Sequence, residues 1–206
     1  YKNIVMDLPF GGGKSIIYFA KESRDETFLH FGSLLNFLKG IYLTADDMNV
    51  SINDMETMRK ITPYAHGIFN KNGEQIPATP YGISLAIKTT IELFESKNHS
   101  GKKTIFISGL GKVGMNLCKF LPKNDFKIFG YDPDIKKSLD AKLKYGVEIV
   151  SPHCIFEEKI DIFSPCATGN IITFDNYQSL KASYVIGGAN CQLEDDILDR
   201  KLLEQG

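Results

Sequence analysis

The sequence contains no tryptophan and only four cysteines and four histidines in 206 residues. Metal sites need ligands at short, characteristic spacings, such as a C-x-x-C pair. The histidines are scattered, and no such spacing occurs among the cysteines, Cys118, Cys154, Cys166 and Cys191. We therefore expect no bound metal, and buried, reduced thiols of the kind found in the cytoplasm.

The sequence also lacks an excess of charge of either sign. It has 24 lysines and arginines against 25 aspartates and glutamates, a net charge of −1. This balance argues against nucleic acid or an anionic membrane surface as a partner. No apolar run approaches the roughly 18–20 residues of a transmembrane helix, and no signal peptide is recognisable. We expect a cytoplasmic globular protein with neither partner. Its first residue is Tyr1 rather than methionine, which is consistent with a fragment.

What the sequence does contain, from about residue 80 onward, is a regular alternation of helical segments and short apolar runs. Helices are predicted over residues 80–96, 112–123 and 134–146, and strands over residues 102–111, 126–132, 147–152, 160–167 and 183–190. Such alternation is typical of βαβ units, with a mostly parallel sheet covered on both faces. We expect an α/β domain over residues 80–206.

Residues 1–79 have a different pattern. Residues 1–10 are compatible with a strand. Residues 26–41 form a helical pattern in which five apolar residues repeat on one side: Phe28, Phe31, Leu34, Leu35 and Leu38. A second helix is predicted over residues 51–61, with Ser51 as its N-cap. We interpret this region as part of a second α/β domain.

A glycine-rich turn ends the strand predicted over residues 102–111. Gly109, Gly111 and Gly114 have the spacing G-x-G-x-x-G, and Asp132 follows 18 positions later, at the end of the next strand. In a dinucleotide site these glycines permit a tight turn, approach of the pyrophosphate and close packing of the helix. An acid at the position of Asp132 binds the ribose hydroxyls and repels a 2′-phosphate. The pattern predicts a Rossmann-type domain that binds NAD.

The stretch PFGGGKSII, residues 9–17, resembles the end of a phosphate-binding loop. The P-loop pattern G-x-x-x-x-G-K-[ST], however, requires a glycine where this chain has Leu8. The glycines would instead let a substrate approach Lys14 closely. A lysine near another cation, or removed from water, can act as a base. Lys2, Lys14 and Asp47 are therefore candidate functional groups, although each alone is also compatible with an ordinary surface side chain.

Six blocks of the sequence resemble, in order, the glutamate/leucine/phenylalanine/valine dehydrogenase family. They are YKNIVMDLPFGGGKSII, YLTADDMNVSINDM, TPYGISLAIK, SGLGKVGMNL, DIFSPCATGNII and VIGGANCQL. The family's P-x-G-G-G-K block, with a second lysine twelve positions upstream, is reproduced by Lys14 and Lys2. The resemblance is strongest to the leucine and phenylalanine dehydrogenase branch.

This resemblance implies a reversible, NAD-dependent oxidative deamination of an apolar L-amino acid to the 2-oxo acid and ammonia. Leucine, valine, isoleucine and phenylalanine are the expected substrates, and a homo-oligomer is expected for the complete protein. Lys2 matches the lysine that pairs with the substrate α-carboxylate, and Lys14 the lysine that activates water and polarises the carbonyl. Asp47 matches the aspartate that moves protons to and from the amino nitrogen.

The resemblance also places Thr79 and Asn190 near the nicotinamide and Ala167 in a backbone stretch that lines the cofactor. The expected substrate-binding residues are Lys2, Gly12 and Asn190. The expected cofactor-binding residues are Thr79, Gly109, Gly111, Lys112, Val113, Gly114, Asp132, Cys166, Ala167 and Asn190.

The chain departs from the family at two positions. Asn49 stands where leucine-type members usually have glycine, and Cys191 where many relatives have asparagine. Two other interpretations stay open. One is a Rossmann enzyme for another substrate, such as a hydroxy acid, which leaves the two lysines and Asp47 unexplained. The other is a degenerate or truncated NAD-binding member without turnover.

Overall fold

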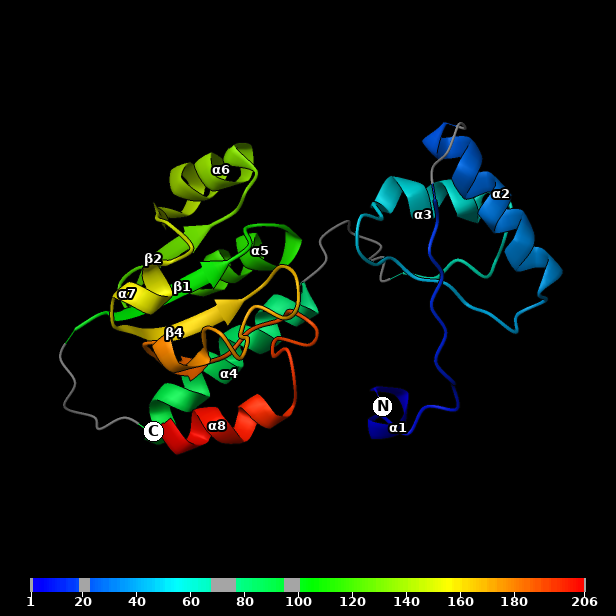
Figure 1. Ribbon diagram of the computed structural model, residues 1–206. Helices are drawn as coiled ribbons and strands as arrows, with labels where there is room; N and C mark the ends of the chain where they lie inside the picture. Colours follow the sequence, from blue (N-terminus) through cyan, green and yellow to red (C-terminus); the bar gives the residue numbers. More distant parts are fainter. Residues whose placement is uncertain (1, 19–22, 68–76, 95–100, 206) are drawn as a thin grey trace. The chain divides into compact units, whose positions relative to one another are not determined.

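The computed structural model describes residues 2–18, 23–67, 77–94 and 101–205 (Figure 1). The chain falls into two compact units, residues 1–75 and 76–206, and each is described by itself. The boundary expected after residue 79 falls inside helix α4 (Ala78–Phe94). Ile83 and Ile87 of this helix pack in the core of the second unit. The helix was expected to continue through residues 95 and 96, which lie outside the described residues.

The second unit is built on one parallel sheet with the strand order β3-β2-β1-β4-β5. This confirms the expected Rossmann-type α/β fold and the position of each predicted strand. The strands are β1 (Lys103–Ser108), β2 (Phe126–Tyr131), β3 (Glu148–Ile149), β4 (Ile160–Pro165) and β5 (Ala182–Val185).

Helices cover both faces of this sheet. Because side chains alternate along a strand, Ile105 and Ile107 of β1 face one core while Phe106 faces another. The first core includes buried residues of α4, α5 (Lys112–Phe120) and α6 (Ile135–Tyr145). Phe106 belongs to the second core, together with Phe163 of β4 and buried residues of α7 (Cys154–Glu157).

Helix α6 ends as the sequence predicts, with Gly146 in the left-handed conformation at a φ of 71°. Three short elements were not predicted: α7, the 3-10 helix η1 (Tyr177–Ser179) and α8 (Ile197–Gln205).

The described residues of the first unit form the helices α1 (Lys2–Val5), α2 (Arg24–Phe37) and α3 (Ile52–Arg59). The strand considered for residues 1–10 is wrong, because residues 2–5 are helical and no strand pairs with them in the described part of the chain. Without a neighbouring strand, the backbone groups of this segment bond locally, for example from the Met6 N–H to the Lys2 carbonyl at 3.2 Å. The β pairing recorded within the described residues of this unit is a single bridge between Thr44 and Ala65.

Capping boxes begin both longer helices of the first unit. Ser23 pairs with Glu26 at the start of α2, and Ser51 pairs with Asp54 at the start of α3, which confirms Ser51 as an N-cap. Phe28 of α2, Met55 and Met58 of α3, and Ala65 after α3 form a small core.

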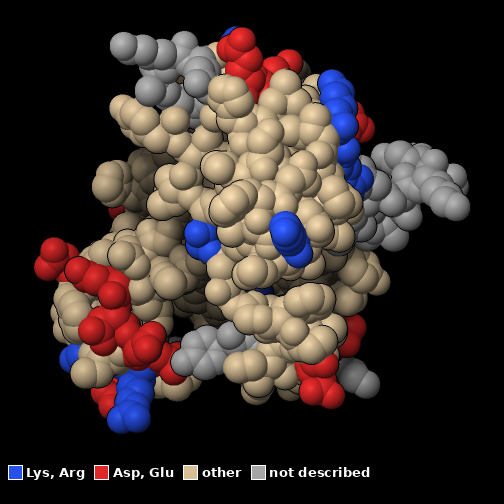
Figure 2. All heavy atoms as spheres, turned by 90° about the vertical axis from the view of Figure 1, so that its right-hand side faces the viewer, with Lys and Arg blue, Asp and Glu red and all other residues tan. Residues whose placement is uncertain are grey.

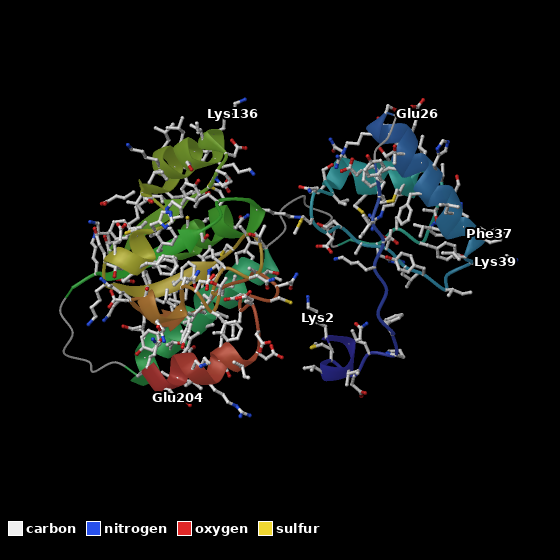
Figure 3. The ribbon with its side chains drawn as sticks, viewed as in Figure 1. Lys2, Glu26, Phe37, Lys39, Lys136 and Glu204 are labelled. Atoms are coloured by element: carbon white, nitrogen blue, oxygen red, sulfur yellow. The ribbon has the colours of Figure 1, made fainter. Side chains whose placement is uncertain are left out.

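The apolar stripe predicted along α2 is only partly buried. Phe28 and Leu35 are inside, but Leu34 is 61% exposed. Phe37, which the prediction did not place in the stripe, is 83% exposed and projects from the end of the helix (Figure 3). In Figure 2, few charged side chains interrupt the middle of the face that is shown.

Candidate functional site

The glycine-rich turn lies between β1 and α5 and is held by close backbone packing. Gly109 has a φ of 96°, which side chains rarely allow, and its N–H bonds to the Tyr131 carbonyl at 2.8 Å. A Cβ on Gly109 would overlap Ala167, and a Cβ on Gly114 would overlap the Gly109 carbonyl oxygen. A Cβ on Gly111 would meet nothing within 4 Å. Two of the glycines are therefore needed for packing, whereas Gly111 leaves space open.

This open space adjoins the N-terminus of α5. Gly111 is the N-cap of the helix and supplies no side-chain hydrogen bond to it. The N–H groups of the first turn are consequently left for another acceptor, and a phosphate is the ligand that such a helix end favours. Lys112, the first residue of α5, is exposed at the same point. The turn fits a dinucleotide pyrophosphate.

Asp132 follows β2 at the same edge of the sheet and is buried. Its Oδ2 accepts a hydrogen bond from the Leu110 N–H, and its Oδ1 accepts one from the Asp134 N–H, both at 2.9 Å. The ammonium of Lys137 lies 4.0 Å from Oδ1. The sequence suggested only a ribose contact for Asp132. The structure adds a second task, since the carboxylate ties the end of β2 to the glycine-rich turn.

The segment after β4 packs against the glycine-rich turn. The Cys166 N–H bonds to the Ser108 carbonyl at 2.8 Å, which places Ala167 beside Gly109. Burial raises the pKa of the Cys166 thiol, so this side chain stays protonated and is not a nucleophile.

The remaining residues expected near the nicotinamide are Thr79, at the start of α4, and Asn190, in the segment after β5. A Cβ on Gly188 would contact side-chain atoms of Val113 at 3.2 Å and Thr79 at 3.5 Å, so these residues surround one glycine. A Cβ on Gly169 would meet the Asn190 carbonyl oxygen at 2.5 Å. All ten residues expected to bind the cofactor thus lie in the second unit. The glycine-rich turn, Asp132 and the segment after β4 follow the carboxyl ends of β1, β2 and β4, where ligands of open parallel sheets bind.

In the first unit the structure brings Lys14 and Asp47 together as an ion pair, although the sequence separates them by 33 positions. Their side chains are 72% and 54% exposed, so both can reach a ligand from solvent. The Asp47 Oδ1 also accepts a hydrogen bond from the Met48 N–H at 2.8 Å. One carboxylate oxygen is thus used by the loop, while the other faces the lysine.

Two hollows adjoin the PFGGGK segment. One, of about 450 Å³, is lined by Lys14 together with an apolar wall from α2 and the following loop, including Phe31, Leu35, Leu38 and Tyr42. The other, of about 370 Å³, contains Lys2 and Gly12. Lys2 projects from the start of α1 (Figure 3). The two hollows share no lining residue, so the structure pairs Lys14 with Asp47 and Lys2 with Gly12 but does not place the two lysines in one hollow.

The loop that carries Asp47 explains one departure from the family pattern. Asn49 has a φ of 60°, in the left-handed region that favours glycine and tolerates asparagine. Cys191 has a φ of 49°, and cysteine is less suited to this region than the asparagine of many relatives. Each departure therefore lies where backbone conformation restricts the choice of residue.

A metal-ligand cluster and a membrane-spanning helix are both absent from the described residues. Nowhere in that part of the chain do three or more histidine, cysteine, aspartate or glutamate side chains gather as metal ligands would. Among the described helices none has both the length and the apolar character needed to span a membrane.

The known proteins that match this chain in sequence include several amino-acid dehydrogenases. The chain is 36% identical over 205 residues to an L-tryptophan dehydrogenase of Nostoc punctiforme, covering 98% of the chain and 58% of that protein. It is 32% identical to a leucine dehydrogenase of Bacillus subtilis, covering 100% of the chain and 58% of the relative. It is 35% identical to a phenylalanine dehydrogenase of Lysinibacillus sphaericus, covering 95% and 54%. The chain is similar over nearly its whole length to these amino-acid dehydrogenases.

The structure agrees with this relationship. The crystal structure of the L-tryptophan dehydrogenase of Nostoc punctiforme matches with a TM-score of 0.66 and 32% identity, over 97% of this chain and 57% of that one. No family model matches the sequence. The chain spans somewhat more than half the length of these amino-acid dehydrogenases, with 58% of the first-named relative covered.

Proposed function

We propose that the full-length protein is an NAD-dependent amino-acid dehydrogenase, which converts an apolar L-amino acid to its 2-oxo acid and ammonia, reversibly. The observation that carries this proposal is the ion pair between Lys14 and Asp47. A cation and a carboxylate, exposed together beside a glycine-rich segment, are what proton transfer at an amino-bearing carbon requires. The glycine-rich turn of the second unit supplies the complementary part, a site for a dinucleotide.

NAD, when bound, supplies the hydride acceptor, and the protein supplies binding and orientation. The turn at Gly111 would receive the pyrophosphate at the N-terminus of α5. Asp132 would bind the adenosine ribose and repel the 2′-phosphate of NADP. Thr79, Asn190 and Ala167 would line the nicotinamide end.

The first unit would hold the amino acid. Lys2 would pair with the substrate α-carboxylate. Lys14 would activate the attacking water and polarise the carbonyl oxygen, and Asp47 would move protons to and from the amino nitrogen. Attack of water on the oxidised C=N carbon forms a C–O bond. Breaking the C–N bond then releases ammonia and leaves the 2-oxo acid.

We propose an apolar or aromatic side chain for the substrate. The support is the apolar wall of the hollow that contains Lys14, in which Phe31, Leu35 and Tyr42 offer no charged partner. Relatives named for leucine, phenylalanine and tryptophan match the chain at 32–36% identity, so tryptophan joins the expected substrates. A cytoplasmic homo-oligomer remains part of the proposal.

A second candidate is a protein that binds NAD without turnover. It is favoured by the separation of Lys2 and Lys14 into different hollows. It is opposed by the presence of all three charged groups that the chemistry needs.

The test is oxidation of NADH by the full-length protein with a panel of 2-oxo acids, with and without ammonium. We expect ammonium-dependent oxidation with 4-methyl-2-oxopentanoate, phenylpyruvate or indolepyruvate, and little with 2-oxoglutarate. Turnover that does not need ammonium would indicate a hydroxy-acid dehydrogenase. NADH binding without turnover on any member of the panel would establish the second candidate.

A further inference from the structure

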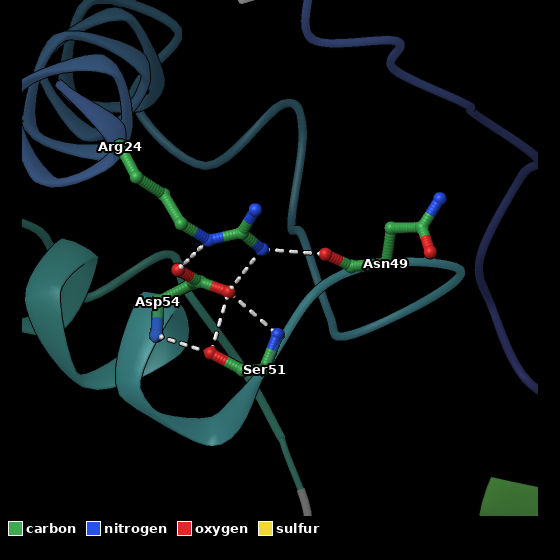
Figure 4. Close-up of polar contacts among 4 residues, drawn as sticks. All are labelled: Arg24, Asn49, Ser51 and Asp54. Carbon is green, nitrogen blue, oxygen red and sulfur yellow. Dashed lines mark hydrogen bonds and ion pairs between the residues drawn. The ribbon is translucent and has the colours of Figure 1, made fainter. Parts of the chain in front are cut away.

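Arg24 and Asp54 form a two-pronged ion pair between the starts of α2 and α3 (Figure 4). The Arg24 Nε donates to Asp54 Oδ1 and its Nη2 donates to Oδ2, both at 2.7 Å. This parallel geometry is the most specific that a guanidinium and a carboxylate can make. Asp54 is only 3% exposed, so the contact is shielded from water on the side of the acid.

The same two side chains also hold the turn that carries Asp47. The Arg24 Nη2 donates a second hydrogen bond, of 2.5 Å, to the Asn49 carbonyl. Asp54 Oδ2 accepts from both the N–H and the hydroxyl of Ser51, at 2.6 Å each. Inside the turn, the Val50 N–H bonds to the Asp47 carbonyl at 3.0 Å. The backbone between Asp47 and Ser51 is therefore tied to Arg24 and Asp54 at two points.

Neither helix needs Arg24 to begin. At the start of α2, the side chains of Ser23 and Glu26 form a capping box, in which each accepts a hydrogen bond from the backbone N–H of the other. At the start of α3 Ser51 and Asp54 form a capping box of their own, in which Arg24 takes no part. What Arg24 adds to the caps is the bond to the Asn49 carbonyl and the second anchor for Asp54. Both act on the turn.

The charge state of the pair suits a permanent anchor. The Arg24 guanidinium beside Asp54 lowers the pKa of that carboxyl to about 2, with the Ser51 hydrogen bonds contributing. Asp54 is thus ionised at any pH at which the enzyme would work, so the ion pair with Arg24 is kept throughout that range.

We infer that Arg24 and Asp54 are positioning residues for Asp47. They hold the turn of residues 47–51, in which Asn49 adopts its left-handed conformation, so that the Asp47 carboxylate faces Lys14. This inference rests on the proposed function, because it takes Asp47 as the proton-transferring acid. A misplacement of about 1 Å at such a group costs on the order of a hundredfold in rate.

The test compares Arg24→Lys, Arg24→Ala and Glu26→Ala in the full-length protein. Arg24→Lys keeps the charge but loses the two-pronged geometry, whereas Glu26→Ala weakens the capping box of the same helix without touching the turn. We expect kcat to fall about tenfold for Arg24→Lys and about a hundredfold for Arg24→Ala. We also expect the acid limb of the kcat–pH profile to shift in both variants, while NADH affinity is unchanged. Glu26→Ala should lower the melting temperature but leave kcat and the pH profile as they are.

Asp47→Asn, measured in the same assay, separates the two hypotheses. If Asp47→Asn abolishes turnover while Arg24→Lys and Arg24→Ala turn over normally, the positioning inference is overturned and the proposed function stands. Equal losses of kcat in Glu26→Ala and Arg24→Ala would also overturn it, since general loosening of α2 would explain both. If Asp47→Asn turns over at the normal rate, the proposed role of Asp47 fails, and the inference fails with it. Should Arg24→Ala not fold, Arg24→Lys alone decides the outcome.

Discussion

The two units of this chain differ in how they hold their candidate functional groups. The second unit surrounds a five-stranded parallel sheet with two apolar cores, and its glycine-rich turn is held by backbone atoms in close contact. The first unit has a core of four residues and leaves large apolar side chains in contact with solvent, such as Ile16 at 94% and Ile41 at 89% exposure. Its candidate catalytic groups lie on loops held by polar contacts.

The difference follows from what each unit is expected to bind. A dinucleotide presents a constant shape, so a site for it can be built into the rigid edge of a sheet. Proton transfer needs charged groups that are exposed to the substrate, whose bonds change during the reaction. Such groups lie on loops outside the core. Accuracy in the first unit must then come from hydrogen bonds such as those of Arg24 and Asp54.

The largest effect is expected from Lys14→Ala, which removes the proposed chemistry and leaves the second unit intact. We expect kcat to fall by a factor of about 10³ or more, because one charged group that touches the reacting atoms is lost. NADH affinity, measured by fluorescence titration, should stay within twofold of the parent. Lys60→Ala removes an exposed lysine at the end of α3 and is the matched control. Normal turnover by Lys14→Ala would remove this lysine from the mechanism.

Gly114→Ala is expected to damage the second unit instead. Its Cβ would overlap the Gly109 carbonyl oxygen, so NADH binding should be lost and the free energy of unfolding should fall by about 1–3 kcal/mol. Gly111→Ala is the variant to compare with Gly114→Ala. Its Cβ meets open space in the protein, so stability should hold while binding weakens at the place where the phosphate must approach. Thermal denaturation measures the stability of both variants. Equal losses of stability in Gly114→Ala and Gly111→Ala would contradict these separate roles.

Asp132→Ala should lower the affinity for NADH at least about tenfold, because a charged acceptor for the ribose is lost. It should also reduce the preference for NADH over NADPH. Asp140→Asn changes an exposed acid on α6 and serves as the control. Since Asp132 also bonds to the Leu110 N–H, some loss of stability should accompany the change in affinity. Unchanged affinity for both cofactors would show that the carboxylate acts on the turn alone.

Acid should destabilise the first unit through Asp54. The pKa of this carboxyl is about 2 in the folded chain against 3.8 for an ordinary aspartate. The folded state therefore binds fewer protons, and the stabilisation is complete above the unfolded pKa and lost as the pH falls through the folded one. With water screening the half-exposed Arg24, we expect about 1–2 kcal/mol between pH 4 and pH 2. In urea titrations by circular dichroism, Asp54→Asn should show a shallower pH dependence across this range; a slope equal to that of the parent would refute the assignment.

The smallest effect is expected from Cys191→Asn. Asparagine tolerates the left-handed conformation found at this position, so the free energy of unfolding should rise by up to about 1 kcal/mol. Cys191→Ala keeps the Cβ without that tolerance and should show no gain. A gain of the same size in both variants would indicate that the thiol, rather than the backbone, is unfavourable.

The sequence was a good guide wherever local chemistry decides structure. Gly146 ends α6 and Ser51 begins α3 as predicted, because caps depend on residues within one turn of the helix. It was a poor guide at residues 1–10, where a strand exists only if another strand pairs with it. The apolar pattern of α2 predicted burial for Leu34, yet burial depends on what packs against the helix.

The candidate sites divide in the same way. Spacing alone identified Gly109, Gly111 and Gly114, because their roles follow from a single turn between a strand and a helix. The sequence could not place Lys14 against Asp47, show that Asp132 anchors the turn, or connect Arg24 to Asp54 across 30 positions. The amino-acid sequence by itself therefore determined the strands of the sheet, the longer helices, the caps at Ser51 and Gly146 and the dinucleotide fingerprint, whose signals lie in neighbouring residues. Only the tertiary structure decided which charged groups meet, since contact between residues far apart in the chain depends on how the elements pack.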